Sequence, residues 1–181
     1  MKTIKVRFFI ILCIGLLLFG CTQSTSTKEK LLGVITKGDL AQGTYGKWFT
    51  PNYNSYETDD AKLKAHKSDL EKFTIHIFMG TWCGDSKKEV PRFYKVLENI
   101  QFPSEKIKLV AVDNSSENYK KSPTGEEKGL NIVRVPTFIF YKDGTEVNRI
   151  IEHPITDFET DIVNIITTNT YIPNYYGVVI K

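Results

Sequence analysis

Residues 73–97, FTIHIFMGTWCGDSKKEVPRFYKVL, join a short apolar run to an amphipathic pattern through a glycine-containing turn. Residues 73–79 combine β-branched and aromatic side chains and stop at Gly80, which indicates a buried strand. From Asp85 onward, apolar residues recur three and four positions apart, at Val90, Phe93, Tyr94 and Leu97. This period predicts a helix directly after the strand.

Cys83 lies in the turn between the predicted strand and the predicted helix, and Ser86 follows three positions later. A thiol at a helix start is close to unsatisfied backbone N–H groups and to the positive end of the helix dipole. Both favour the thiolate, which is the nucleophilic form. Ser86 could donate its hydroxyl to the sulfur, whereas the charge of Asp85 opposes the thiolate. The alternative is a small residue that fills a tight turn between Trp82 and Gly84.

The segment before this unit is harder to assign. Residues 31–58 are rich in glycine and aromatic residues without a clear period, so we expect an irregular lead-in with a possible strand at 53–57. A helix is predicted over 59–72, because Thr58 can cap it and Leu63 and Leu70 lie seven apart on one face.

Downstream, residues 107–112 form a second apolar run, and the polar residues 113–129 predict a long loop with some helix. Strands at 135–141 and 146–151 are joined through Asp143-Gly144, a strong hairpin signal. Thr156 and Glu159 form a capping-box pattern for the last helix. This order predicts an α/β fold with a central mixed sheet and helices on both faces.

Three motifs in this order resemble the thioredoxin-like family: Trp82-Cys83-Gly84, Pro91 eight positions after the cysteine, and Val135-Pro136-Thr137. The resemblance covers about residues 59–168. It implies a thioredoxin-like fold, with the active site at Cys83 and its neighbours Trp82, Gly84, Asp85 and Ser86. It also implies that Val135, Pro136 and Thr137 form a cis-proline segment that binds the substrate backbone. The alternative for Pro136 is a trans proline at the start of an edge strand.

Two residues depart from the dithiol members of that family. Ser86 occupies the position of their second cysteine, and Ile77 stands where many of them keep a buried carboxylate. A dithiol cycle is therefore excluded, and an external thiol must resolve a mixed disulfide at Cys83. Cys-Gly-Asp-Ser is also similar to the motif of monothiol glutaredoxins, but Trp82 and the predicted export of the chain argue against that relationship.

Glu152 and His153 follow Pro136 by about sixteen residues, in a loop that approaches the active site in thioredoxin-like folds. His153 could then stabilise the thiolate or supply a proton; the alternative is a solvated turn. His66 and His76 have no second cysteine or acidic cluster in register, so we predict no metal site and no cofactor.

The first twenty residues predict an export signal, with a basic start and an apolar run too short for a membrane span. Leu18-Phe19-Gly20-Cys21 resembles the lipobox of bacterial lipoproteins, which implies lipidation of Cys21; the alternative is an ordinary cleaved signal peptide. Residues 21–30 would then be a flexible tether. We therefore expect an envelope protein, anchored to a membrane and facing the periplasm or the exterior.

Loss of the signal would remove Lys2, Lys5 and Arg7, and so lower the Lys plus Arg count from 24 to 21, equal to the 21 Asp plus Glu. A neutral chain gives no support for a nucleic-acid partner. With Cys13 removed and Cys21 lipidated, Cys83 would be the only thiol of the folded body. We expect a monomer that exchanges disulfides with exported cysteine proteins or small disulfides, or alternatively a binding module without redox chemistry. Residues 169–181 are predicted to be a C-terminal extension.

Overall fold

The computed structural model describes residues 30–168 and 170–180. The predicted signal peptide (1–20), the predicted lipid site at Cys21 and all but the last residue of the predicted tether (21–30) lie outside the described residues. Within the described part of the chain, no helix is both long and apolar enough to cross a membrane.

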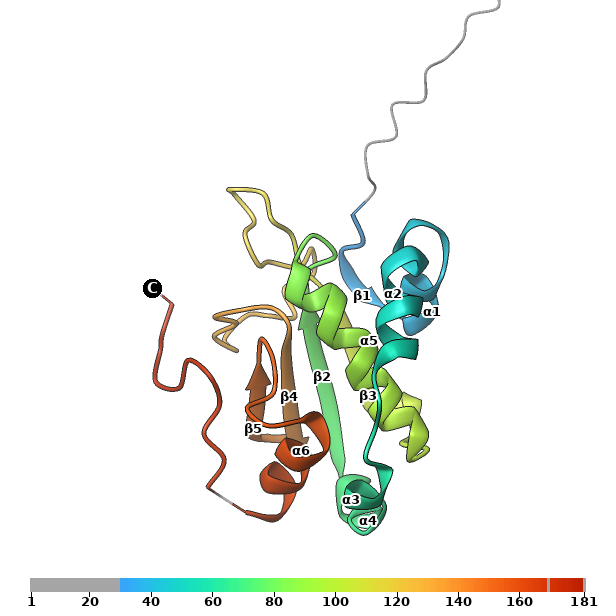
Figure 1. Ribbon diagram of the computed structural model, residues 1–181. Coiled ribbons are helices and arrows are strands. Elements are labelled where there is room, and N and C mark those ends of the chain that lie inside the picture. Colours follow the sequence, from blue (N-terminus) through green and yellow to red (C-terminus); the bar gives the residue numbers. More distant parts are fainter. Residues whose placement is uncertain (1–29, 169, 181) are drawn as a thin grey trace, which may run out of the picture.

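Five strands form one mixed sheet (Figure 1), in the order β1 (Gly33–Ile35), β3 (Ile107–Ala111), β2 (Phe73–Met79), β4 (Thr137–Lys142) and β5 (Thr145–Ile151). β2 and β3 are parallel, and the other neighbouring pairs are antiparallel. Helix α5 (Gly84–Asn99) and the 3-10 turn η1 (Ser104–Lys106) connect the parallel pair, since parallel strands need a crossover. The predicted α/β class and central mixed sheet are confirmed.

One face of the sheet carries the larger core. Phe93 of α5 is central to it, with its ring centroid 4.3 Å from that of Phe138 on β4 and 5.2 Å from that of Phe158 on α6 (Phe158–Thr167). Burial of one large apolar side chain contributes roughly 1.5–3 kcal/mol. This aromatic cluster therefore fixes α5, the end of which carries Cys83, to the centre of the sheet.

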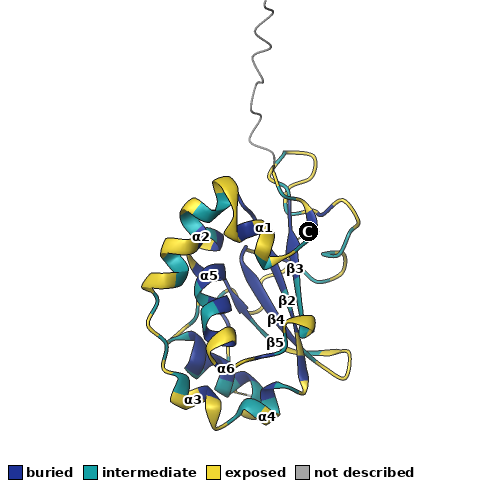
Figure 2. Ribbon diagram, turned by 90° about the vertical axis from the view of Figure 1, so that its right-hand side faces the viewer, coloured by how far each residue is buried: buried dark blue, intermediate teal, exposed yellow. Residues whose placement is uncertain are grey.

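The described helices pack on this face of the sheet, whereas loop residues cover the opposite face (Figure 2). All six described α-helices contribute buried residues to the larger core, among them Leu40, Phe49, Leu63, Leu70, Phe93 and Phe158. The opposite face holds a smaller cluster that includes Phe78 and Ile139 and is covered by Val112, Ile132 and Val135. We expected helices on both faces, but the described segment 112–136 contains turns and no helix. Its polar composition lacks the apolar period that a packed helix requires.

The hairpin of β4 and β5 agrees with its prediction. β4 ends at Lys142 and β5 begins at Thr145, so Asp143 and Gly144 form a two-residue loop. Both have positive φ, 51° and 77° respectively. A tight hairpin turn that matches the strand twist requires this left-handed backbone, which Asp-Gly adopts readily.

The lead-in is regular, in contrast to our expectation. It contains β1, α1 (Lys37–Ala41) and α2 (Gly43–Ser55), and no strand at 53–57. Thr36 and Asp39 form a reciprocal capping box that starts α1. Phe49 of α2 is buried against Tyr94 of α5, with ring centroids 6.3 Å apart. The helices depend on such long-range packing, which the irregular apolar pattern does not reveal.

The predicted helix over 59–72 is divided into α3 (Asp60–Lys64) and α4 (Lys67–Leu70). Leu63 and Leu70 are nevertheless both buried, as their spacing predicts. Thr58 does not cap the helix; its hydroxyl accepts a hydrogen bond from the Asn99 amide at 2.7 Å instead.

The cap of α6 also differs from its prediction. Asp157, rather than Thr156, accepts the Thr160 N–H, at 2.6 Å. Glu159 is buried, and its carboxylate binds the Tyr56 hydroxyl at 3.2 Å and the Asp59 N–H at 3.0 Å. The acidic residue of the expected capping box therefore joins the lead-in to the domain.

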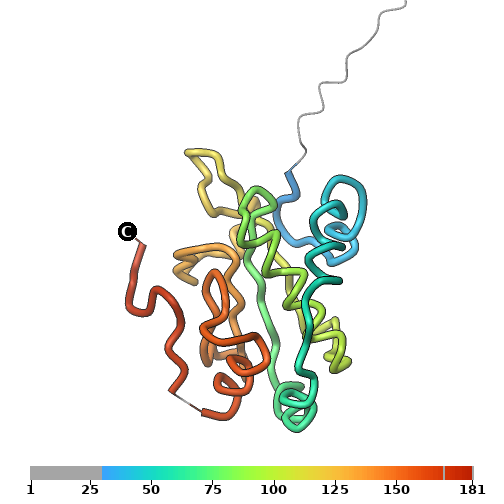
Figure 3. Tube along the Cα trace, viewed as in Figure 1, coloured from blue at the N-terminus to red at the C-terminus, as the bar shows by residue number. Residues whose placement is uncertain are grey.

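Residues 170–180 form no helix or strand and run beside the edge strand β5 (Figures 1 and 3). Side-chain amides attach this C-terminal segment to β5: Asn148 donates to the Tyr171 carbonyl at 2.9 Å, and Asn174 donates to the Ile151 carbonyl at 3.2 Å. A covered edge is protected from pairing with other chains.

Candidate functional site: Cys83 and the Val135–Pro136 segment

Cys83 is the N-cap residue of α5. Its backbone is extended, with φ −83° and ψ 131°, and its carbonyl accepts the Lys87 N–H at 3.1 Å, which begins the helical hydrogen bonds. The Cys83 N–H closes a turn onto the Gly80 carbonyl at 2.9 Å. The thiol therefore lies at the amino end of a sixteen-residue helix, where the dipole favours negative charge.

The sulfur of Cys83 contacts the segment that precedes β4. The Cys83 thiol donates a hydrogen bond to the carbonyl oxygen of Val135, with Sγ 3.1 Å from that oxygen, and the thiol is only partly exposed. The Val135–Pro136 peptide bond is cis. Thr137 is buried and donates its hydroxyl to the Arg134 carbonyl at 2.6 Å, which holds this turn closed. The residues singled out at Cys83 and at 135–137 thus lie together.

Ser86 has a different partner from the one expected. Its side chain is fully buried, and Oγ accepts the Gly80 N–H at 3.2 Å, rather than donating to Sγ of Cys83. Ser86 therefore stabilises the Cys83 turn from its buried side. Gly84 and Asp85 are exposed in the first turn of α5, where the Asp85 carboxylate complements the helix dipole.

Trp82 also holds the Cys83 turn in place. Its indole N–H donates to the Val112 carbonyl at 2.9 Å, and its ring lies 5.8 Å from the Tyr119 ring. A Cβ at Gly80 would be 2.5 Å from the indole ring, so only glycine fits there. Trp82 thus links the Cys83 turn to the loop 113–121.

Lys120, which the sequence did not single out, belongs to the site. Its ammonium group donates to the Val133 carbonyl, two residues before the carbonyl that Sγ of Cys83 contacts. Burial is the main cause that lowers the pKa of Lys120, and the Arg134 cation adds to it, whereas the charges of Cys83 and Glu152 act in the opposite direction. No periodic pattern in the polar loop predicts this position, because the approach depends on the fold of the loop.

Glu152 and His153 are neighbours in the sequence but have different contacts. The Glu152 N–H donates to the Pro136 carbonyl at 2.7 Å, and its carboxylate accepts the Tyr175 hydroxyl at 2.6 Å. His153 is exposed, and its Nδ1 lies 3.0 Å from the Pro154 carbonyl and 3.4 Å from the Asn174 amide. Glu152 therefore belongs to the rim of the site, whereas the contacts of His153 are with its own turn and the C-terminal segment.

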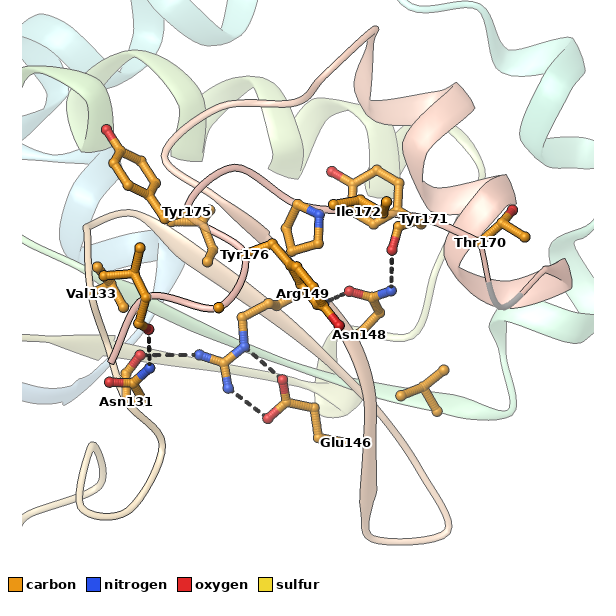
Figure 4. Close-up of a pocket in the computed structure, with 15 residues that line it drawn as sticks. Asn131, Val133, Glu146, Asn148, Arg149, Thr170, Tyr171, Ile172, Tyr175 and Tyr176 are labelled. Atoms are coloured by element: carbon orange, nitrogen blue, oxygen red, sulfur yellow. Dashed lines mark hydrogen bonds and ion pairs between the residues drawn. The ribbon is translucent and has the colours of Figure 1, made fainter. Parts of the chain in front are cut away.

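A pocket of about 750 Å³ lies beside this site, between β5 and the C-terminal segment (Figure 4). Arg149 crosses it and is fully engaged: Nε and Nη2 bind the Glu146 carboxylate at 2.6 Å, and Nη1 donates to the Leu130 carbonyl at 2.8 Å and the Asn131 carbonyl at 3.3 Å. The guanidinium group thus holds the loop before β4 in place. Within residues 30–168 and 170–180, no group of three metal-ligating side chains occurs.

Comparison with known proteins finds a matching family model and several similar proteins. The Thioredoxin family model matches residues 55–166. Thioredoxin Asp f 29 of Aspergillus fumigatus is 32% identical over 55% of this chain and 84% of its own length. Thioredoxin H-type of Oryza sativa subsp. indica is 29% identical over 61% of this chain and 81% of its own length. The structure of Fasciola hepatica thioredoxin shares 23% identity, with a TM-score of 0.36, and covers 57% of this chain and 86% of its own.

The family match includes the Cys83 turn, Pro91 within α5 and the segment before β4. The matched residues are more than half of the chain. The mixed five-stranded sheet is consistent with this family match. This chain belongs to the thioredoxin family, a family of thiol–disulfide redox proteins.

Proposed function

We propose that this protein is a membrane-anchored, monothiol thiol–disulfide exchange factor that acts through Cys83. The contact of 3.1 Å between Sγ of Cys83 and the Val135 carbonyl carries the proposal, because it seats the nucleophile against the cis Val135–Pro136 segment, which we propose binds the substrate backbone. Exported proteins with cysteines, and small disulfides, are the proposed substrates.

In the proposed reaction, the Cys83 thiolate attacks one sulfur of a disulfide R–S–S–R′. A Cys83–S–S–R bond forms, the original S–S bond breaks, and R′–S⁻ leaves with the electron pair and then takes up a proton. The helix start stabilises the attacking thiolate. Asp85 and Gly84 shape the first turn of that helix, and Trp82 and Ser86 hold the turn in position.

The mixed disulfide must be released from outside. Ser86 stands one turn after Cys83 and carries no thiol, and Cys83 is the free cysteine of the described residues. A thiolate R″–S⁻ then attacks the R sulfur, forms R–S–S–R″ and releases Cys83 as a thiolate. Electrons balance over the two steps, since one disulfide and one thiol give one disulfide and one thiol.

Lipidation at Cys21 would hold this domain at a membrane surface of the cell envelope. The lipobox-like sequence Leu18-Phe19-Gly20-Cys21 supports this part of the proposal. A Cys21→Ser variant of the full chain should lose the mass of the acyl groups and move to the soluble fraction after cell lysis. An unchanged mass and membrane fraction in that variant would remove the anchor from the proposal and leave the chemistry of Cys83 intact.

Mass spectrometry of the intact protein after incubation with oxidised glutathione tests the exchange step. We expect a mixed-disulfide adduct that dithiothreitol removes, and none on a Cys83→Ala variant. A Ser86→Ala variant is the matched control, because it alters the same turn and keeps the thiol. If the native chain forms no adduct at micromolar protein and millimolar oxidised glutathione, the proposed exchange activity is wrong.

The absence of a second cysteine at position 86 favours one other function, a non-catalytic binding module that uses the surface beside Pro136. Capture of cell-envelope proteins by the full chain separates the two. Adducts that are lost on reduction and in Cys83→Ala indicate exchange, whereas equal non-covalent capture by both chains indicates binding.

A further inference from the structure

The structure brings a lysine to the proposed nucleophile from an unexpected part of the chain. The ammonium group of Lys120 donates to the Val133 carbonyl, and Sγ of Cys83 contacts the Val135 carbonyl at 3.1 Å. Both groups are therefore bound to the same three-residue stretch. The contact between the Trp82 and Tyr119 rings, at 5.8 Å, joins the flanking residues as well.

The loop that carries Lys120 is closed on itself. The Lys120 N–H donates to the Asp113 carbonyl at 2.8 Å, and the Asp113 N–H donates to the Lys121 carbonyl at 2.9 Å. Lys120 has a φ of 58°, a left-handed backbone that is uncommon for a residue with a side chain. The position of the side chain is thus set by the loop and by the Val133 carbonyl together, rather than by free rotation in solvent.

We propose that Lys120 is a positioning residue for the exchange reaction, whose fixed positive charge stabilises the Cys83 thiolate. This inference rests on the proposed function. The physical reason is that an opposite charge close to a thiol favours the ionised form of the thiol. Solvent and salt weaken this interaction less when the two groups are partly buried. The interaction is mutual, and the charge of Cys83 accordingly counteracts the lowering of the Lys120 pKa by burial.

The other charged side chains around this site differ from Lys120 in their exposure and in their partners. Arg134 is exposed and lies over the Tyr175 ring, with its guanidinium carbon 5.1 Å from the ring centroid. Glu152 binds the Tyr175 hydroxyl, and Asp85 is exposed on the first turn of α5. The Asp85 carboxylate, two residues after Cys83, thus opposes the thiolate, and Lys120 is the half-buried cation among the described residues that interacts with Cys83.

Lys121 provides a matched control. It is the next residue, it is exposed, and its ammonium group donates to the Glu117 carbonyl at 3.0 Å, within the loop. Lys120→Met and Lys121→Met therefore make the same change in net charge in the same loop. Lys120→Arg keeps the charge, and Lys120→Gln removes it while keeping a donor for the Val133 carbonyl.

The experiment measures the alkylation rate of Cys83 in the full chain from pH 5 to 9, with neutral iodoacetamide and with anionic iodoacetate. For Lys120→Met and Lys120→Gln we expect a roughly tenfold slower reaction at pH 6, a higher pH midpoint, and a lower ratio of iodoacetate to iodoacetamide rates. Lys121→Met and Lys120→Arg should follow the native profile. Structural damage alone would not shift both the pH midpoint and the ratio of the two alkylation rates. It would also not be absent in Lys120→Arg, which keeps the charge.

Three results have different consequences. If Lys120→Gln, folded by circular dichroism, follows the native pH profile, the role of Lys120 is wrong and the proposed exchange function remains. If Lys121→Met slows the reaction as much as Lys120→Met, the effect is one of general charge and the inference is also overturned. If native Cys83 reacts no faster at pH 6 than a model thiol peptide, activation of Cys83 itself fails.

Discussion

Sγ of Cys83 lies 3.1 Å from the carbonyl oxygen of Val135, the residue directly before Pro136. The two positions are 52 residues apart in the sequence. The contact exists because β2 and β4 are neighbouring antiparallel strands, with Phe78 paired to Thr137. The end of β2 and the start of β4 therefore meet at one edge of the sheet, where the turn after β2 leads into α5.

Introduction of a second cysteine tests the geometry of the Cys83 turn. Ser86→Cys should form a disulfide with Cys83 and gain the ability to reduce insulin in the presence of dithiothreitol. Loss of the hydroxyl leaves the Gly80 N–H without its acceptor, which costs about 1–3 kcal/mol of unfolding free energy. Insulin turbidity and thiol counting are the measurements, with Ser86→Ala as the control that shares the lost acceptor. A folded variant that keeps two free thiols under oxidising conditions would contradict this geometry.

Gly80 is expected to tolerate no side chain. A Cβ there would lie 2.5 Å from the indole ring of Trp82, so Gly80→Ala must displace Trp82 or the turn. Overpacking of this kind typically costs about 1–3 kcal/mol. Urea denaturation should show the loss, and Trp82 fluorescence should change in the native state. Gly84→Ala is the comparison, because nothing lies within 4 Å of a Cβ at that position; equal stability losses in both variants would disprove the steric explanation.

His76 should make the protein less stable in weak acid. Burial, and next the Lys108 cation, lower the pKa of this half-buried histidine below its usual value of 6.5. The folded chain therefore holds His76 neutral where the unfolded chain is already protonated, and the unfolding free energy falls as the pH drops from about 7 through 6.5 toward the lower folded pKa.

Denaturant titrations at pH 7.5 and 5.5 measure this effect. The decrease in stability between the two pH values should be smaller in His76→Gln, which cannot take up a proton. Lys108→Met should give an intermediate decrease, since it removes the second cause of the shift and leaves burial. An identical decrease in the native chain and in His76→Gln would assign the acid sensitivity to other groups.

Arg149 should be irreplaceable by lysine. Its planar guanidinium group binds the Glu146 carboxylate through two nitrogens and two backbone carbonyls of the loop before β4 through a third. Lysine has the charge but not the fork geometry. We expect Arg149→Lys to lower the unfolding free energy by about 1–3 kcal/mol, whereas Lys142→Arg at the exposed end of β4 changes it little. Thermal denaturation of both variants checks this, and an unchanged Arg149→Lys would contradict the role of the clamp.

Local sequence alone determined the centre of this protein. Residues 73–79 form a buried strand, the helix after Cys83 follows its predicted period, and Asp143-Gly144 forms the predicted turn. These features depend on interactions between residues a few positions apart, so their spacing is visible in the sequence. The same holds for the position of Cys83 at a helix start.

Tertiary structure decided the remainder. The lead-in helices pack on the domain through contacts such as that between Phe49 and Tyr94, and the buried Ser86 hydroxyl accepts the Gly80 N–H. Lys120 reaches the Cys83 site from a polar loop without a periodic pattern. Such contacts join residues that are far apart in the chain, and only the paired strands and the packed core define which of them meet.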